Sequence, residues 1–450
     1  MQAPQPLRCA GRRLGRRMDR VSAERMETPG RRILYLSYDG MSDQLGQSQV
    51  LPYLAGLTGR GHRISLISFE KSSRSDAEID AARRACDAAG VDWHPLPYHK
   101  RPPILSSLYD LLVMRRQAER LQRQSRFDWV HCRSYLPALV GLAMKRRHGL
   151  RFLFDMRGFW ADERVDGGLW DLKNPLFRAV FRYFKRKESE LLREADHIVS
   201  LTEQARRIML ERPDRAVDGP PISVIPCCVD FNHFRPVAGS RRETARNSLG
   251  IAAGQRVAAY LGSIGTWYML DEMLDFFRVQ LERDPGALLL MITRDDPAPI
   301  LAAAEARGVP RDAVTIGGAT RDEVPLFTSA ADYGLFFIRP TFSKAASCPT
   351  KLGEFLALEI PVVTNGGVGD VAEIVEDSGA GVLVKRFDEP GYRDALDRLE
   401  RLELHKDQAR QRARIWFDLD SGVERYDAIY REAATDWNSS TSRGACEASE

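Results

Sequence analysis

The sequence predicts an α/β protein made of two doubly wound units, each a parallel sheet with helices on both faces. From residue 33 onward, short apolar runs of strand length alternate with helix-length amphipathic segments. This alternation is typical of parallel sheets that are buried on both faces. It breaks at residues 212–221, which are rich in Pro, Asp and Gly, and then restarts. Two successive units joined near residues 212–235 are the simplest architecture that explains the pattern.

The length of 450 residues suits two such units, because single hydrophobic cores stop growing near about 250–300 residues. We expect domains at 31–215 and 222–415, and a helix at 416–435 that crosses back onto the first domain. Residues 1–30 form a basic extension and residues 438–450 a polar tail, and both are predicted to be disordered. The ligand site of such a protein is expected in the cleft between its two sheets.

The strands are predicted from short apolar runs with no polar alternation. In the first unit these runs lie at 33–38, 64–69, 129–131, 152–155 and 197–201. In the second unit they lie at 223–225, 257–261, 288–292, 314–316, 333–337, 362–364 and 382–384.

Charge and cysteine content exclude several classes of function. The net charge is +4, and residues 1–32 hold nine arginines against three acidic residues, so the rest of the chain is close to neutral. That balance argues against general nucleic-acid binding. The seven cysteines are scattered without metal-ligand spacing, so we expect no metal site, no disulfide framework and a reducing, cytoplasmic location. No apolar run reaches the roughly 18–20 residues that span a bilayer.

Residues 342–364 place a small-residue loop, a helix start and two lysines between two apolar runs. Pro349 belongs in the first helical turn, where a missing N–H costs nothing, and the helix must end before Pro361. Lys351 and Glu354 then lie one turn apart, away from the apolar face of the helix.

A helix start of this kind can bind an anion. Its free N–H groups and positive dipole end attract a phosphate, and Lys344 or Lys351 can add a full charge. A carboxylate one turn deeper, at Glu354, suits the hydroxyls of a ribose. The pattern therefore describes a nucleoside diphosphate site, although a capped surface helix with one Lys–Glu pair explains this segment equally well.

Two glycine-containing loops could also approach a phosphate. The first unit's opening strand is followed by a loop with Gly46 and a helix from about Gln47, whose start offers N–H donors. This loop lacks the G-x-G-x-x-G spacing, and a plain strand-to-helix loop is an equal alternative. In the second unit, Gly262 and Ser263 follow the strand at 257–261 and would let the backbone come close to a ligand.

Polar residues follow two strands of the first unit, where a cleft would lie. His131 and Arg133 end one strand, and a satisfied core histidine explains His131 as well as catalysis does. Asp155 and Arg157 end the next strand among aromatic residues and are harder to explain by packing. The candidate catalytic residues are therefore Lys351, Lys344, Arg157, Asp155, Arg133 and His131.

The predicted helix at 175–192 is basic and amphipathic. Such a helix can lie on the inner face of an anionic membrane as a peripheral contact. The alternative, which we favour, is a helix that faces the core and keeps a solvated basic edge.

Three segments together resemble a known family. Residues 224–236 are similar to its "IPNGVD…F.P" junction, residues 354–363 to its "EAMACG.PVV" segment, and residues 365–370 to the "GG..E" loop that follows. In this order they resemble the family 4 glycosyltransferases, whose GT-B fold has two Rossmann-like domains facing across a cleft. The similarity covers roughly residues 32–435.

The resemblance implies a retaining, hexosyltransferase-type enzyme of polysaccharide or glycolipid biosynthesis. It would move a sugar from a nucleotide sugar, held by the second domain, to a glycan, lipid or small-molecule acceptor on the first, without a metal or bound cofactor. Glu354 would hold the donor ribose and the 347–351 loop the diphosphate. The expected donor site comprises Gly46, Gln47, Gly262, Ser263, Arg294, Ser347, Pro349, Thr350, Glu354, Gly366 and Gly367.

The sequence departs from the family pattern at the first glutamate of its E-x7-E motif, where this chain has Ala346. It also lacks the Arg/Lys pair often found after the second domain's first strand. The loop from Ser347 to Lys351, with Lys344, resembles a variant arrangement of some members that would supply the missing phosphate charge, and Arg294 is another candidate. Arg133 stands where many members have a second histidine. A sugar-nucleotide epimerase of the same fold remains an alternative, and so does a non-catalytic nucleotide-sugar-binding partner, which Ala346 would favour.

Overall fold

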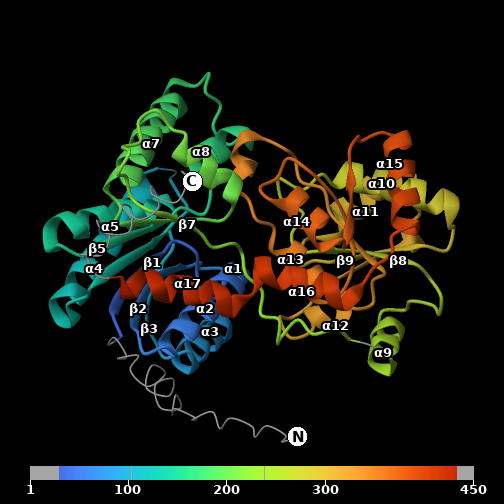
Figure 1. Ribbon diagram of the computed structural model, residues 1–450, viewed down its shortest axis with the longest axis horizontal. Coiled ribbons are helices and arrows are strands. Elements are labelled where there is room, and N and C mark those ends of the chain that lie inside the picture. Colours follow the sequence, from blue (N-terminus) through green and yellow to red (C-terminus); the bar gives the residue numbers. More distant parts are fainter. Residues whose placement is uncertain (1–29, 103, 238, 433–450) are drawn as a thin grey trace, which may run out of the picture.

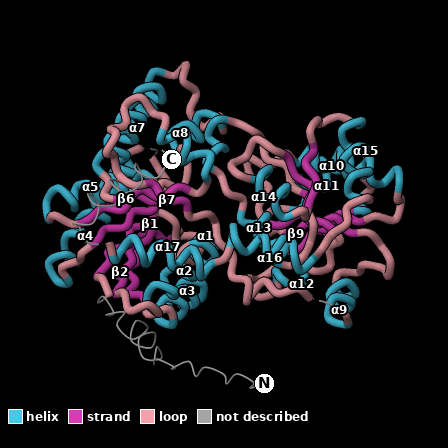
Figure 2. Tube along the Cα trace, viewed as in Figure 1, coloured by secondary structure: helices cyan, strands magenta, loops and turns pink. Residues whose placement is uncertain are grey.

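A computed structural model describes residues 30–102, 104–237 and 239–432, so the predictions for the two ends of the chain lie almost wholly outside it. The chain forms two lobes, each a parallel sheet with helices on both faces (Figures 1 and 2). This confirms the predicted α/β architecture of two doubly wound units. Among the described residues, no helix has the length and apolarity to cross a bilayer.

The first lobe is built on a parallel sheet with the strand order β3-β2-β1-β4-β5-β6-β7. Its strands are β1 (Arg32–Ser37), β2 (Arg63–Glu70), β3 (Val91–Pro97), β4 (Trp129–Arg133), β5 (Arg151–Asp155), β6 (His197–Ser200) and β7 (Ile222–Val224). Its helices are α1 (Gln44–Gln49), α2 (Leu51–Thr58), α3 (Asp76–Ala88), α4 (Leu105–Ser125), α5 (Tyr135–His148), α6 (Trp160–Asp166), α7 (Pro175–Glu194) and α8 (Glu203–Leu210).

The second lobe contains a parallel sheet with the order β10-β9-β8-β11-β12-β13. Its strands are β8 (Val257–Leu261), β9 (Leu288–Ile292), β10 (Val314–Gly317), β11 (Tyr333–Leu335), β12 (Val362–Asn365) and β13 (Gly381–Val384). The helical segments after β7 are α9 (Ser240–Ser248), α10 (Leu270–Arg283), α11 (Pro297–Ala306), η1 (Arg311–Ala313), α12 (Val324–Thr328), η2 (Phe342–Ala346), α13 (Thr350–Ala357), α14 (Val371–Ser378), α15 (Glu389–Glu400), α16 (Lys406–Phe417) and α17 (Leu419–Arg431).

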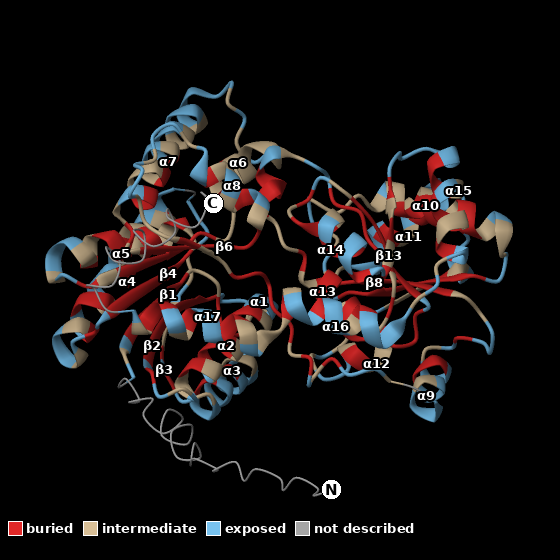
Figure 3. Ribbon diagram, viewed as in Figure 1, coloured by how far each residue is buried: buried red, intermediate tan, exposed pale blue. Residues whose placement is uncertain are grey.

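The apolar runs form strands because both faces of each sheet are covered. The residues of β4, β8 and β9 are buried throughout, and exposed residues lie on the outward faces of the helices (Figure 3). One apolar cluster fills the second lobe, and two others lie on the two faces of the first sheet. This burial explains why the strands lack polar alternation.

Two strands differ from the prediction. β3 was not predicted, because Val91–Pro97 is an edge strand with polar residues and two prolines, which suit a sheet edge rather than its centre. The strand expected at 223–225 was assigned to the second unit, and that is wrong. β7 pairs in parallel with β6 and completes the first sheet, so the crossover between lobes begins after β7 rather than at 212–221.

The last helix returns to the first lobe, so the chain passes between the lobes twice. α17 packs along α2 and places Tyr426 and Tyr430 in the core beside β1 and β4 (Figure 1). The indole of Trp129 donates to the Tyr430 carbonyl at 3.2 Å. Val229 and Asp418 form a parallel bridge where the two crossing segments meet.

A second contact between the lobes is formed by η2, which packs against α6 and α8. The rings of Phe159 and Phe342 stack with centroids 5.1 Å apart. The Thr202 hydroxyl donates to the Ala345 carbonyl at 2.7 Å, and the Asp370 carboxylate accepts from the first backbone N–H groups of α8. These contacts fix the position of the loop that leads into α13.

Candidate active site

A cavity of about 360 Å³ lies between the two lobes. The first lobe contributes α1, and the second lobe contributes strand ends and the first turns of α13. Its lining residues are Gln44, Leu45, Gln47, Ser48, Phe234, Leu261, Gly262, Ser263, Tyr268, Ile292, Thr293, Arg294, Asp295, Ala319, Arg321, Val324, Thr350, Lys351 and Glu354. The cavity therefore has the place expected for a ligand of facing doubly wound sheets.

The first turn of α13 opens into this cavity. The helix begins at Thr350 with Pro349 as its N-cap, one residue later than predicted, and no side chain caps it among the described residues. Its apolar face, with Leu352 and Phe355, is fully buried in the second lobe. Packing thus holds the helix while its positive end remains available to an anion.

The amino group of Lys351 is buried and has no hydrogen-bonding partner within the described residues. Its Nζ finds no acceptor in the described chain and lies 3.8 Å and 3.5 Å from the ring centroids of Tyr260 and Tyr268. Burial holds the pKa of this lysine well below its usual range. Gly262, beside Nζ, has φ of +102°, so the backbone conformation of this loop favours glycine, although a Cβ there would make only ordinary contact with Nζ at 3.7 Å.

A buried ammonium without an acceptor is costly, and aromatic faces compensate it only in part. A phosphate oxygen would supply the missing charge-assisted hydrogen bonds. The charge at Lys351 and the uncapped start of α13 therefore point to one anionic ligand in the cavity.

Glu354 is the carboxylate that faces the same cavity. Burial raises its pKa to about 7, and the nearby cations Arg321 and Lys351 oppose that shift. No side-chain partner of Glu354 occurs within the described ranges. Its oxygens are thus available to accept hydrogen bonds from hydroxyl groups of a ligand.

The rim of the cavity carries further charges. Arg294 is exposed and donates to the Ala319 carbonyl at 3.2 Å. The Asp295 carboxylate accepts from the Ser263 hydroxyl at 3.0 Å and from the Ile264 N–H at 2.6 Å. The loop predicted to approach a phosphate is therefore tied to Asp295, and the N–H of Ile264 is already occupied.

Lys344 lies outside the cavity, although the sequence pattern gave it the same phosphate-binding role as Lys351. Its Nζ donates to Oε1 of Glu163 at 2.7 Å and lies 3.7 Å from the ring centroid of Trp267. Burial lowers its pKa, and Glu163 opposes that effect. The ion pair joins η2 of the second lobe to α6 of the first.

Several predicted donor residues do not line the cavity, namely Gly46, Ser347, Pro349, Gly366 and Gly367. Gly46 lies inside α1 rather than before a helix, and a Cβ there would come within 2.2 Å of the Gly40 carbonyl oxygen. Gly367 has φ of +77°, and a Cβ there would approach Pro340 to 2.9 Å. Both glycines therefore serve close packing beside the cavity.

Ala346, where the resemblance led us to expect a glutamate, is buried in η2 against the core of the first lobe. The methyl group of Ala346 does not line the cavity. Any contact with a ligand that a glutamate at this position would make has to be made by other residues in this protein.

The candidates of the first lobe form a separate buried cluster. Nδ1 of His131 lies 2.5 Å from the Tyr430 hydroxyl, and its Nε2 lies 3.5 Å from Oδ2 of Asp155. Nη1 of Arg157 lies 3.8 Å from the same carboxylate oxygen, and Nε of Arg133 donates to Asp39 at 3.0 Å.

This cluster does not line the cavity but connects to the loop before α13. Although burial would raise the pKa of Asp155, Arg157 and His131 lower it below its usual range. Nη2 of Arg157 contacts Sγ of Cys227 at 3.4 Å, and the Cys227 N–H points to Sγ of Cys348. The structure thus brings Lys351, Glu354, Thr350, Gln47, Gly262, Ser263 and Arg294 together around one cavity, and the other candidates lie outside its lining.

Sequence reasoning missed Arg321, Asp295 and the two tyrosines under Lys351. Arg321 and Asp295 follow strands in loops with ordinary polar composition, so no local signal marked them. Tyr268 follows the Gly262–Ser263 loop that was predicted to approach a ligand. Its contact with Lys351 joins residues far apart in the chain, so no local signal marked it either.

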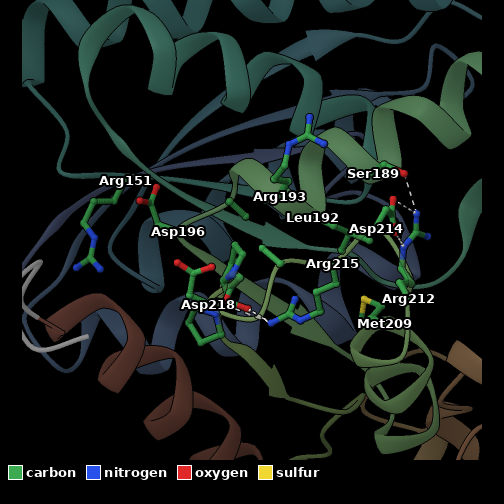
Figure 4. A pocket seen from close by; sticks show the side chains of 15 residues that line it. Arg151, Ser189, Leu192, Arg193, Asp196, Met209, Arg212, Asp214, Arg215 and Asp218 are labelled. Carbon is green, nitrogen blue, oxygen red and sulfur yellow. Dashed lines mark hydrogen bonds and ion pairs between the residues drawn. The ribbon is translucent and has the colours of Figure 1, made fainter. Parts of the chain in front are cut away.

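Another cavity, of about 460 Å³, lies in the first lobe between α7, α8 and the loop before β7 (Figure 4). Its charged groups largely satisfy one another, because Arg212 pairs with Asp214 at 2.9 Å and Arg215 donates to the Pro220 carbonyl at 2.7 Å. It contains none of the predicted site residues, so the cavity between the lobes is the stronger candidate.

Both lobes match known family models. Residues 46–228 match the glycosyl transferase 4-like domain, and residues 241–416 match the glycosyl transferases group 1 domain. Curated relatives include the D-inositol 3-phosphate glycosyltransferase of Nocardia farcinica, 24% identical over 330 residues that cover 70% of this chain and 68% of the relative. The enzyme of that name from Actinosynnema mirum is 24% identical over 303 residues, or 63% of this chain and 66% of the relative. These matches span about two thirds of the relatives' length.

Solved structures share the fold over nearly the whole chain. Sucrose-phosphate synthase from Thermosynechococcus elongatus has a TM-score of 0.68 at 15% identity, covering 89% of this chain and 98% of that one. Alr3699/HepE of Anabaena, in complex with UDP and glucose, has a TM-score of 0.66 at 13% identity, covering 90% and 100%. The family matches across both lobes, together with this fold, show that the chain belongs to the family 4 glycosyltransferases of GT-B fold and is a glycosyltransferase.

Proposed function

We propose that the protein transfers a sugar, with retention at the anomeric carbon, from a nucleoside diphosphate sugar bound in the cavity between the lobes. The acceptor, a glycan, a lipid-linked sugar or a small molecule, would bind to the first lobe. The observation that carries the proposal is the buried, unpartnered ammonium of Lys351 at the uncapped start of α13, one turn from Glu354.

In this proposal, Lys351 and the first N–H groups of α13 meet the diphosphate of the donor. Negative charge grows on the diphosphate as the sugar departs, so groups aimed at it stabilise the transition state more than the ground state. Glu354 accepts hydrogen bonds from the ribose hydroxyls. A phosphate oxygen of the donor takes the acceptor proton, so the proposal requires neither a dedicated base nor a metal ion.

The relatives support the choice of donor class. Alr3699/HepE of Anabaena has been solved in complex with UDP-glucose as well as with UDP. The curated relatives are named as glycosyltransferases that act on D-inositol 3-phosphate. A nucleoside diphosphate sugar is therefore the donor class to test, and the acceptor has to be found by experiment.

The test is a thermal-shift panel of nucleotide sugars, followed by product analysis with and without cell-envelope acceptors. Lys351→Ala should depress turnover, and Glu354→Ala should mainly weaken nucleotide binding. Lys385→Ala, which removes an exposed lysine after β13, is the matched control. If both site variants keep full activity with a proven donor, the assignment is wrong.

The same experiment separates two rival functions. An epimerase would convert the nucleotide sugar when no acceptor is present. A non-catalytic partner would be stabilised by a nucleotide sugar yet show neither hydrolysis nor transfer with any acceptor. Because Ala346 stands where the resemblance expects a glutamate, this outcome is worth testing.

We place the enzyme in the cytoplasm, because its scattered cysteines favour a reducing compartment.

A further inference from the structure

An apolar stripe lies exposed on α4. Leu105, Leu108, Tyr109 and Leu112 are each more than half exposed. Their spacing of three, four and seven residues places them on one face of the helix. The opposite face carries buried residues such as Met114 and packs on the core. A run of exposed leucines on a well-packed helix is a sign of an interaction surface.

Cations bracket this stripe at both ends. Lys100 and Arg101 precede the helix, and Arg115 and Arg116 follow the last leucine by about one turn. All four are exposed, and none has an ion pair within the described ranges. Long basic side chains at the edge of an apolar surface can keep their charges in a polar layer while their stems cover apolar groups.

The stripe runs into a basic groove of about 450 Å³ between α4, α5 and α7. The groove is lined by Arg115, Leu139, Leu142, Ala143, Arg146, Arg147, Tyr183 and Lys187. Ion pairs with Glu119 and Glu190 neutralise part of this charge. The three helices nevertheless hold thirteen Lys and Arg residues against five Asp and Glu.

α7 extends the surface on the other side of the groove. Leu176 and Tyr183 are exposed and lie two turns apart on one face, and Tyr183 borders the groove. Arg178, Arg182 and Arg186 are exposed and carry no ion pair within the described residues.

The buried side of α7 includes Phe184, Glu188 and Leu191, which agrees with the core-facing alternative for the helix predicted at 175–192. Lys185, by contrast, pairs with Asp162 at 2.8 Å and with Glu188 at 2.7 Å, and therefore belongs to the fold. The basic residues that remain available lie on the outer edge of α7.

We infer that the face formed by α4, α5 and the outer edge of α7 docks on an anionic lipid bilayer. The leucines of α4 enter the boundary between headgroups and acyl chains, and the arginines around the groove contact lipid phosphates. α4 and α5 lie at the end of the first lobe that faces away from the second lobe (Figure 1). Docking there leaves the cavity between the lobes free, and the inference does not depend on the proposed donor.

The charge pattern favours a lipid surface over a second copy of the chain. A symmetric dimer through the stripe would set Arg115 and Arg116 of one copy against the like charges of the other, because such an interface uses the same patch twice. An anionic bilayer instead offers opposite charge around an apolar interior. An anionic bilayer therefore matches both the apolar residues and the cations of this face.

The first experiment is flotation of the full chain with two kinds of vesicle, phosphatidylcholine alone and phosphatidylcholine with phosphatidylglycerol. We expect binding to the anionic vesicles, and the triple variant Leu105→Ser/Leu108→Ser/Leu112→Ser should bind at least about tenfold less. Ile415→Ser, which changes an exposed residue of α16, is the control and should bind as the wild type does. Equal flotation of the triple variant and the wild type overturns the inference.

The second experiment tests the charges. Arg115→Gln/Arg116→Gln/Arg182→Gln should reduce binding to anionic vesicles, and added salt should reduce wild-type binding in the same way. Equal binding to neutral and anionic vesicles contradicts the inference. So does a wild-type dimer in sedimentation velocity that the serine variant dissolves, since the stripe then contacts a second copy.

Folding of both variants is checked by thermal unfolding and by the shift that a nucleotide sugar produces. All substituted residues are exposed and lie outside the cavity, so both readouts should match the wild type.

Discussion

Lys344 and Lys351 belong to one segment of the second lobe and are both buried, yet their surroundings differ. Lys344 in η2 is paired with Glu163 across the lobe interface. Lys351 in α13 has two aromatic faces and no acceptor within the described part of the chain. The paired lysine connects the lobes, and the unpaired lysine faces the cavity. The partner of a buried cation, rather than its burial, therefore separates a structural role from a ligand-binding role.

The physical reason is the cost of an uncompensated charge. A carboxylate partner offsets the loss of hydration at Lys344, whereas Lys351 keeps most of that cost in the unliganded protein. The low pKa of Lys351 is the sign of that cost. A ligand that brings a phosphate to Lys351 would supply the missing acceptor and so remove this cost. The removal of the cost would favour binding of that ligand.

The largest effect is expected from Lys351→Met, which keeps the side-chain volume and removes the charge. Turnover should fall by about 10²–10³-fold, the usual cost of losing one preorganised group at a developing anion. The thermal stability of the unliganded protein should rise, because methionine needs no acceptor in this apolar site. The measurements are kcat with a proven donor and the unfolding temperature without ligand.

Lys344→Met is the matched comparison and should show the reverse pattern, with lower stability and a smaller loss of turnover. If both variants lose turnover equally while Lys351→Met is destabilised, the distinction between the two lysines fails.

The next effect concerns the pair of Lys344 and Glu163. Lys344→Met and Glu163→Gln should each cost about 1–3 kcal/mol, because each leaves one charge at the lobe interface without its partner. The double variant should cost clearly less than the sum of the two single variants. Denaturant unfolding of the four proteins measures this coupling. Additive costs would show that the ion pair contributes nothing to stability.

Much of the fold could be predicted from the sequence, since α/β alternation follows directly from short apolar runs between amphipathic segments. β3 could not, because Val91–Pro97 is an edge strand whose stability comes from its pairing with β2 rather than from an apolar run. β7 was recognised as a strand but assigned to the wrong sheet. The sequence of a three-residue strand does not indicate which strand it will pair with. The pairing of β7 with β6 is determined by tertiary structure.

The candidate site shows the same division between local and distant information. Lys351 and Glu354 are one helical turn apart, so their shared face could be read from spacing. The fate of Lys344 depends on Glu163, which lies in the other lobe and far away in the chain. Arg321 likewise lines the cavity through tertiary structure alone. Composition predicts which charges are available, and packing decides which of them find partners.

Glu354 should make stability depend on pH. Its carboxyl has a pKa near 4.5 in the unfolded chain and about 7 in the folded protein, since burial disfavours the charged form. Stability is therefore lost as pH rises between about 4.5 and about 7, and the loss is complete above that range. Glu354→Gln has no proton to lose, so its stability should exceed that of the wild type by about 1–3 kcal/mol above pH 7 and by little at low pH.

Thermal unfolding across this pH range measures the difference, with Glu373→Gln on the exposed face of α14 as control. The same Glu354 variant should show a smaller thermal shift with nucleotide, because an amide accepts ribose hydroxyls less well than a carboxylate. If the stability difference between Glu354→Gln and the wild type does not change with pH, Glu354 is not the group that titrates in this range.

The smallest effect is expected at Arg294, the exposed charge at the rim of the cavity. Arg294→Gln should raise the KM for the donor by about threefold or less at low salt, because an exposed charge acts through a high dielectric. The effect should disappear at high ionic strength, where the screening length falls to about 3 Å. The loss in Lys351→Met should persist there, since a buried charge is screened much less. If Arg294→Gln instead lowered kcat independently of salt, the charge that the chemistry needs would be that of Arg294 at the rim and not that of Lys351.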